Sequence, residues 1–161
     1  EEAVRNARRL VEAGAQCLKI EGGRAVLPQV EAVLAAGIPV CGHLGMLPQQ
    51  ILLEGGYRIK GKAEAEQKVL LEDALALEKA GVMAIVLELV QKDFTPQITA
   101  ALKIPTIGIG SGAACDGQVL VTHDLTGAFP WFTPRHVTPA LQTGEDIRRT
   151  VREWIGSLKQ P

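Results

Sequence analysis

Four ionisable side chains stand at the ends of short apolar runs, where an enzyme could use them. Lys19 and Glu21 close the first run, and His43 follows the second. Glu88 lies inside a third run, Val82–Val90, whose remaining residues are all apolar. Such a run predicts a strand buried on both faces, as in a parallel sheet. There its carboxylate would be partly desolvated, which favours the protonated form unless a cation or hydrogen-bond donors compensate. An ammonium, two carboxylates and an imidazole suit chemistry on a small anionic carbonyl compound, often with a divalent metal ion.

Each of these residues also has a structural interpretation. Lys19 and Glu21 are two positions apart on one side of a strand, so they could simply pair; a Schiff-base lysine would need a depressed pKa. Glu21 precedes two glycines, which favours a metal ligand or its neighbour because glycine lets a ligand approach closely. His43, between two glycines, could bond the backbone or touch a substrate. Glu88 could be a salt-bridged or solvent-reaching residue at a strand end.

Two further motifs carry less information. The turn Gly108–Gly112 resembles a phosphate-cradling loop, but it is not a dinucleotide fingerprint and no acidic ribose partner follows it. His123 and Asp124 could form a dyad, yet adjacent residues in a strand face opposite ways, so we interpret the pair as structural.

A repeated pattern of helix, glycine and strand would position these groups. Three amphipathic stripes end at Gly14, Gly37 and Gly81, each followed by a short apolar run. Glycine just past a helix takes the left-handed conformation that turns the chain back. A fourth unit runs from helix Thr95–Leu102 to an apolar strand. The last helix is predicted over about Asp146 to Leu158, with Thr143 as its N-cap.

Alternating helices and strands predict an α/β fold with a mainly parallel sheet, either an open doubly wound sheet or a (β/α)8 barrel. A whole barrel needs about 200 to 250 residues, and the sequence has four clear strands with a fifth less clear. If it is a barrel, it is roughly half of one. Gly42–Lys62 is predicted to be one long functional loop, and no internal domain boundary is evident.

Composition excludes several classes of function. The 161 residues carry a net charge of −1 without long runs of like charge, which indicates neither nucleic acid nor a membrane as partner. The apolar stretches are too short to span a bilayer. Three cysteines without a CxxC spacing favour reduced core thiols in a cytoplasmic protein. The chain opens in a helix without Met or a capping residue, so we expect that its start is missing.

Several motifs in order, covering almost the whole chain, resemble the ketopantoate hydroxymethyltransferase (3-methyl-2-oxobutanoate hydroxymethyltransferase) family. They are Lys19–Gly23, Pro39–Gly45, Gly55–Gly61, Asp73–Glu78, Leu87–Glu88, Ile104–Gly110, Asp116–Val121 with His123-Asp124, and Gly144–Arg148. One departure is Met46–Leu52, where the family usually has Leu-Thr-Pro-Gln-Ser-Val-Asn.

The resemblance implies a (β/α)8 TIM barrel of the phosphoenolpyruvate/pyruvate type. Residues 1–161 would be the C-terminal part of that single domain, holding strands 4 to 8. The first three βα units, which supply two metal-binding aspartates and a substrate-binding serine, would be absent. We therefore expect an isolated chain to be inactive, to need the N-terminal half or a second chain as partner, and to form a homo-oligomer.

The resemblance also implies a reaction and roles. The family transfers a hydroxymethyl group from 5,10-methylenetetrahydrofolate to 3-methyl-2-oxobutanoate in pantothenate synthesis, through a Mg²⁺-stabilised enolate. Glu88 would remove the C3 proton, Lys19 would bind the keto acid, and Glu21 would belong to the Mg²⁺ site. His43 would lie close to the substrate.

Two alternatives remain. One is another 2-oxo acid lyase or mutase of the same superfamily; those usually carry a Lys-Lys-Cys-Gly-type loop, which this sequence lacks. The other is a non-catalytic barrel fragment that keeps the fold and not the site. It would bind no keto acid even with the N-terminal half restored.

Overall fold

A computed structural model describes residues 1–158, and the chain divides into two compact units, Glu1–Gln118 and the segment from Val119 onward. The helices and strands of the first unit are α1 (Glu2–Glu12), β1 (Leu18–Glu21), α2 (Leu27–Ala35), β2 (Val40–Gly45), α3 (Glu64–Ala80), β3 (Ala84–Glu88), α4 (Thr95–Ala101), β4 (Thr106–Ile109) and β5 (Gly117–Gln118). The second unit contains α5 (Thr122–Leu125) and α6 (Thr143–Ser157).

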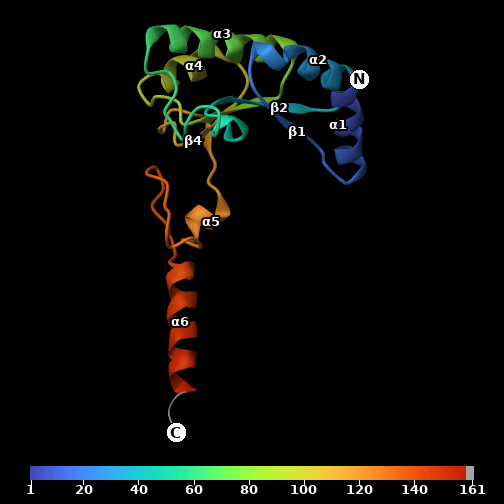
Figure 1. The fold of residues 1–161 in the computed structure, drawn as a ribbon. Coiled ribbons are helices and arrows are strands. Elements are labelled where there is room, and N and C mark those ends of the chain that lie inside the picture. The colour runs from blue at the N-terminus through green and yellow to red at the C-terminus, as the bar shows by residue number, and fades with distance from the viewer. Residues whose placement is uncertain (159–161) are drawn as a thin grey trace. The chain divides into compact units, whose positions relative to one another are not determined.

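The five strands form one parallel sheet in the order β1-β2-β3-β4-β5 (Figure 1). This confirms the predicted α/β class with a parallel sheet. Glu21 is in register with His43, and Glu88 is in register with Gly45 on one side and Ile109 on the other. The carboxyl ends of four strands therefore meet along one edge, where the candidate residues lie.

One face of the sheet forms the core. Leu18, Val40, Leu44, Ile85 and Leu87 project to this face and are buried in one apolar cluster. Helices supply the other side of the cluster, through residues including Val30 and Val33 of α2, Leu70 and Leu77 of α3, and Ile98 of α4. Figure 1 shows α2, α3 and α4 together on one side of the strands. Apolar burial between helices and this face holds the strand ends in register.

The opposite face of the sheet is less covered within the first unit. Val86 and Ile107 project to it and stay partly exposed, as do Glu21 and Glu88. The prediction that Val82–Val90 is a strand buried on both faces is therefore wrong in the described chain. The strand is also shorter, Ala84–Glu88, and Met83 before it is 55% exposed.

The glycines after three helices have the left-handed backbone conformation that the sequence predicted. Gly14, Gly37 and Gly81 have φ of 105°, 78° and 100°, in the left-handed region that favours glycine. The long-loop prediction needs correction, because β2 continues to Gly45 and only the segment after it leaves the sheet. The continuation of β2 puts His43 inside a strand instead of in a loop.

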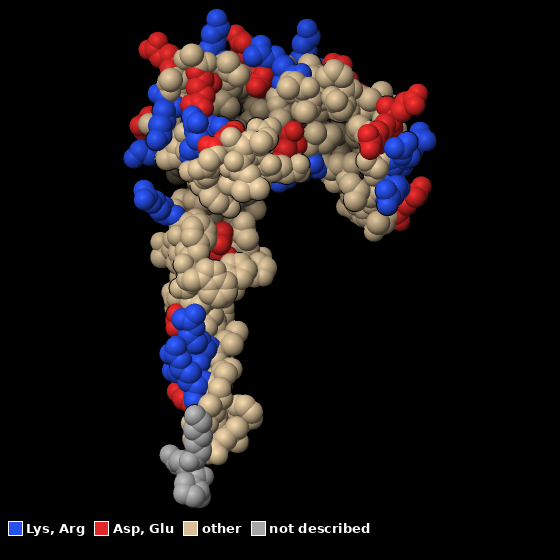
Figure 2. Space-filling view, viewed as in Figure 1, with Lys and Arg blue, Asp and Glu red and all other residues tan. Residues whose placement is uncertain are grey.

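The second unit departs from two predictions. Helix α6 begins at Thr143 with Gln142 as its N-cap, and the Thr143 hydroxyl donates to Thr126 O at 2.9 Å instead of capping the helix. His123 and Asp124 lie in the short helix α5, not in a strand. Apolar side chains of α6 are exposed, and Figure 2 shows Lys and Arg side chains along one side of this helix.

The three cysteines are free thiols, and Cys17 is exposed, so the prediction of core thiols does not hold for that residue. Burial raises the pKa of the thiols of Cys41 and Cys115, which keeps them protonated and poorly nucleophilic. Among the helices in residues 1–158, none has both the length and the apolar character needed to cross a bilayer.

Candidate active site

The four candidate residues form a continuous row of contacts across β1, β2 and β3. Lys19 Nζ lies 3.8 Å from Glu21 Oε1, and the same oxygen lies 3.7 Å from His43 Nδ1. On the other side of the ring, His43 Nε2 lies 3.2 Å from Glu88 Oε2. We call Lys19, Glu21, His43 and Glu88 the strand-end row. The sequence predicted each member and the sheet edge, and the structure brings all four together.

Burial changes along the strand-end row. The side chain of His43 is completely buried, Glu21 and Glu88 are 17% and 16% exposed, and Lys19 is 48% exposed. The imidazole is thus enclosed between two carboxylates that still reach solvent. The lysine, at the end of the row, has its ammonium available to a ligand.

His43 does not make the backbone bond that the sequence left open. Within residues 1–158, neither ring nitrogen has a hydrogen-bond partner. The 3.2 Å separation from Glu88 is short enough for a hydrogen bond, but the ring N–H is not directed at the oxygen. Buried polar atoms usually find a partner, and Glu88 Oε2 is nearer to the ring than Glu21 Oε1.

The backbone at the end of β3 takes an unusual path. Leu89, directly after Glu88, has a φ of 48°, the one positive value at a non-glycine residue in the described chain. A residue with a Cβ in this left-handed conformation costs about 1–2 kcal/mol, so the surrounding contacts must hold it. Met46 N–H donates to Glu88 O at 2.8 Å, and Lys60 N–H donates to Leu89 O at 2.8 Å.

Gly45 allows β2 to approach this turn. It has a φ of 96°, and a Cβ added to it would collide with the carbonyl oxygen of Glu88. A side chain at position 45 would therefore displace the backbone that carries the Glu88 carboxylate.

Ser111 is a residue that sequence reasoning missed. Its hydroxyl is fully buried and donates to Leu87 O at 2.7 Å, while Val90 N–H donates to it at 2.9 Å. In the glycine-rich turn Gly108–Gly112, the serine hydroxyl is thus hydrogen-bonded to the backbone at strand β3 and not to a phosphate. The only signal in the sequence was a hydroxyl between two glycines at a strand end, which does not distinguish these uses.

Glycine after Glu21 was expected to let a ligand approach closely, but at Gly23 the group that approaches is a protein side chain. A Cβ on Gly23 would collide with the carboxylate of Asp73. Asp73 Oδ1 accepts the backbone N–H of Arg24 at 3.2 Å and the Arg24 side chain Nε–H at 2.6 Å. Gly23 therefore makes room for a helix carboxylate that fixes the turn after β1.

The row fits a metal site only in part. No three His, Cys, Asp or Glu side chains in residues 1–158 are grouped to hold a metal ion. One oxygen, Glu21 Oε2, is buried and has no hydrogen-bond partner in this part of the chain. A carboxylate oxygen in that condition suits a cation or its bound water. Of the four residues in the row, Glu21 is therefore the one that could offer an oxygen to a cation.

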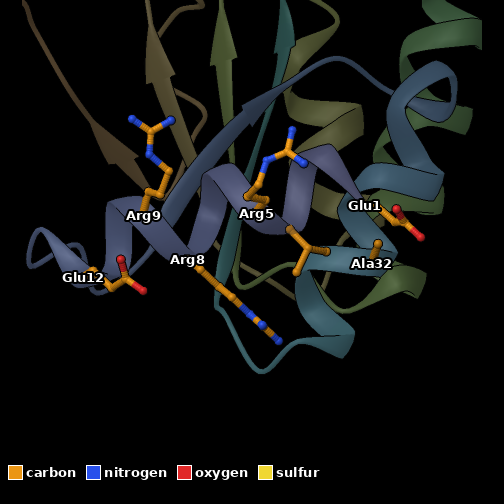
Figure 3. Close-up of a pocket in the computed structure, with 7 residues that line it drawn as sticks. Glu1, Arg5, Arg8, Arg9, Glu12 and Ala32 are labelled. Atoms are coloured by element: carbon orange, nitrogen blue, oxygen red, sulfur yellow. The ribbon is translucent and has the colours of Figure 1, made fainter.

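Two hollows on the first unit lie away from most of the strand-end row. One lies over α1 and α2 and is lined by charged residues including Glu1, Arg5, Arg8 and Arg9. In Figure 3 these arginines point in different directions, so they do not converge on one ligand. A second, largely apolar hollow between α1 and β1 includes Lys19.

The chain matches one protein family along its whole length. The profile of that family, described as ketopantoate hydroxymethyltransferase, matches residues 1–161. The chain is similar to the 3-methyl-2-oxobutanoate hydroxymethyltransferase of Moorella thermoacetica, with 56% identity over 160 residues, 99% of this chain and 60% of the relative.

Two further relatives carry the same name. The protein of Ignicoccus hospitalis is 51% identical over 159 residues, 99% of this chain and 60% of the relative. The protein of Acetivibrio thermocellus is 50% identical over 159 residues, 98% of this chain and 56% of the relative. The chain thus spans between 56% and 60% of the length of these relatives.

Proposed function

The chain belongs to the ketopantoate hydroxymethyltransferase family, and on that premise we propose that it carries half of the active site for this reaction. The complete protein would transfer a hydroxymethyl group from 5,10-methylenetetrahydrofolate to 3-methyl-2-oxobutanoate, giving 2-dehydropantoate. The observation that carries the proposal is the strand-end row, four ionisable side chains in contact at the carboxyl ends of adjacent parallel strands. Catalytic groups of α/β barrels gather at this edge.

We propose that the sheet is strands 4 to 8 of a (β/α)8 barrel, with residues 1–161 as the C-terminal part of one domain. The last three of those residues lie outside the part that the structure describes. Parallel sheets are normally covered on both faces, whereas here helices pack on one face and Val86 and Ile107 stay partly exposed on the other. Three further βα units would close this second face into a barrel interior.

Glu88 is the proposed base. The C3–H bond of the keto acid breaks, its proton moves to a Glu88 carboxylate oxygen, and its electron pair is drawn toward the adjacent carbonyl. C3 then forms a bond to the one-carbon unit of the folate, and both C–N bonds that hold this carbon to the folate break. A water molecule supplies the hydroxyl group of the product. The second hydrogen of that water and the proton taken up by Glu88 go to the two folate nitrogens, so that tetrahydrofolate leaves. Contact with His43 Nε2 at 3.2 Å would hold one Glu88 oxygen and leave the other, partly exposed, to face the substrate.

Lys19 and Glu21 have supporting roles in the proposal. The half-exposed Lys19 ammonium would bind an oxygen of the keto acid. Glu21 would contribute its unpartnered Oε2 to a Mg²⁺ site completed by residues outside this chain. When bound, Mg²⁺ would polarise the keto carbonyl and so acidify the C3 proton.

The test supplies the missing part of the barrel. The chain would be joined to, or mixed with, the portion of the Moorella thermoacetica relative that lies outside the match. Loss of the C3 hydrogen of 3-methyl-2-oxobutanoate would be followed by NMR in D₂O with Mg²⁺ and tetrahydrofolate. We expect exchange, and we expect Glu88→Gln to lower its rate by about 10³-fold. Glu64→Gln, on an exposed glutamate at the start of α3, is the matched control and should keep the parent rate.

The outcomes separate the alternatives. A complex that forms without exchange would favour the non-catalytic fragment. Exchange that survives Glu88→Gln would remove Glu88 from its role. Exchange without transfer of the one-carbon unit would point to another 2-oxo acid enzyme of the superfamily.

A further inference from the structure

Two strands must stay fixed to each other for Glu88 to keep its position. The last backbone bond between β3 and β4 at this end runs from Leu89 N–H to Ile109 O, at 2.9 Å. Beyond it Leu89 turns the chain away with a φ of 48°, and β4 ends at Ile109. The peptide segment that carries Glu88 therefore lies where the backbone ladder stops.

Ser111 extends the link between the strands past this point. It lies two residues beyond β4, and its hydroxyl donates to Leu87 O at 2.7 Å and accepts Val90 N–H at 2.9 Å. A hydroxyl has one hydrogen, so the 3.5 Å separation from Ile109 O is a secondary contact. One oxygen atom thus binds the residue before Glu88 and the second residue after it.

We propose that Ser111 is a positioning residue for Glu88, a role that rests on the proposed function. By joining Leu87 and Val90 it closes a small ring of contacts around the Glu88 peptide and holds Leu89 in its left-handed conformation. Ser111 is completely buried, so water cannot replace the hydroxyl without rearrangement. The Glu88 carboxylate, 3.2 Å from His43, then keeps a fixed direction relative to the strand-end row.

The first experiment is Ser111→Ala in the completed protein, assayed by C3 hydrogen exchange. A displaced base loses rate without weakening ground-state binding, so we expect kcat to fall about 10- to 100-fold while KM for the keto acid stays within about twofold. Thr106→Val is the matched control. It removes another buried hydroxyl of the same strand region, one that bonds Asp116 at the opposite end of β4, and it should leave kcat near the parent value.

The second experiment does not depend on catalysis. Amide hydrogen exchange should show Val90 losing protection by about tenfold or more in Ser111→Ala, while the amides of Val40–Gly45 keep theirs. Ser111→Cys, with a weaker donor of similar size, should give intermediate values in both experiments and replaces the alanine variant if that variant does not fold.

The results distinguish failure of this inference from failure of the proposed function. If the parent exchanges the substrate hydrogen and Ser111→Ala retains kcat within twofold, Ser111 does not position Glu88. If the parent shows no exchange, the proposed function fails, and the amide data alone decide. Unchanged protection at Val90 would then overturn the inference, and loss of protection would support it as a property of the Glu88 backbone.

Discussion

The imidazole of His43 separates two carboxylates from neighbouring strands, with Nε2 3.2 Å from Glu88 Oε2 and Nδ1 3.7 Å from Glu21 Oε1. The parallel register places His43 opposite Glu21, and Glu88 lies one pleat further along the neighbouring strand. The ring can therefore contact both acids while keeping them from approaching each other. The two roles proposed above, metal binding at Glu21 and proton removal at Glu88, would be held apart in this way by one buried side chain.

Removing the ring nitrogens should affect rate more than folding. In the completed protein we expect His43→Phe to lower kcat for C3 exchange by about tenfold or more, because the Glu88 carboxylate loses its nearest polar neighbour. The free energy of unfolding should change by less than about 1 kcal/mol, since two unpartnered buried nitrogens are replaced by carbon. Enzyme assay and urea denaturation measure the two quantities. Full activity in His43→Phe would reduce His43 to a space-filling residue.

Gly45 and Gly14 offer a matched pair of substitutions. Both have strongly positive φ, 96° and 105°, but an added Cβ meets Glu88 O at position 45 and nothing within 4 Å at position 14. We expect Gly14→Ala to cost about 1–2 kcal/mol of stability from backbone strain alone. Gly45→Ala should cost about 3 kcal/mol or more and also lower activity. Equal costs in denaturant unfolding would show that the contact with Glu88 is relieved without strain.

Asp116 should make stability depend on pH at the acid end. Hydrogen bonds from the backbone N–H and hydroxyl of Thr106, at 2.8 and 3.0 Å, lower the pKa of this carboxyl. A folded pKa below the unfolded value near 3.9 gives stabilisation that is present above about pH 4 and lost as the pH falls through the folded pKa. Asp116→Ala should lower the midpoint of thermal unfolding by a few degrees at pH 7.

The difference between parent and Asp116→Ala should shrink as the pH falls below about 4. Asp93→Ala is the control, because Asp93 is exposed and accepts a long hydrogen bond, 3.5 Å, from the side-chain amide of Gln91; it should give a small, pH-independent change. A gap between parent and Asp116→Ala that stays constant from pH 7 to pH 2.5 would contradict the assignment.

The thiols should react in an order set by burial. Cys17 is exposed, whereas burial raises the pKa of Cys41 and Cys115 and lowers their thiolate fraction. Alkylation by iodoacetamide at pH 8, followed by mass spectrometry, should label Cys17 about tenfold faster than the other two. If Cys41 were labelled faster than Cys17, its thiol would be more exposed in solution than the structure shows.

The sequence was sufficient to predict most of the helices and strands, and the sheet edge at which the candidate residues lie. Apolar periodicity located the helices, and glycines such as Gly81 marked where they end. Because the carboxyl ends of parallel strands share one edge, residues as distant as Lys19 and Glu88 could be assigned to a common site. Their contacts through His43 depend on the register of β1, β2 and β3, which the apolar pattern alone does not predict.

Other features depend on tertiary contacts that no local pattern reports. The length of β2 was underestimated because Gly42 and Gly45 disfavour strand when judged alone; in the structure Gly42 packs against Leu77 and Gly45 against Glu88. Ser111 was missed because the same hydroxyl between glycines could face a ligand or a neighbouring strand. His123 and Asp124 were assigned to a strand, whereas i to i−4 bonds such as Thr126 N–H to Thr122 O make that segment helical.

Alternation along the strands has an evolutionary consequence. In β3, Ile85 and Leu87 face the helices while Val86 and Glu88 face the other way. Substitutions at Ile85 and Leu87 would therefore act on folding, and those at Glu88 on the chemistry proposed for it, with little interference between the two. Directed evolution could vary the helix-facing positions for heat resistance while leaving the reaction untouched.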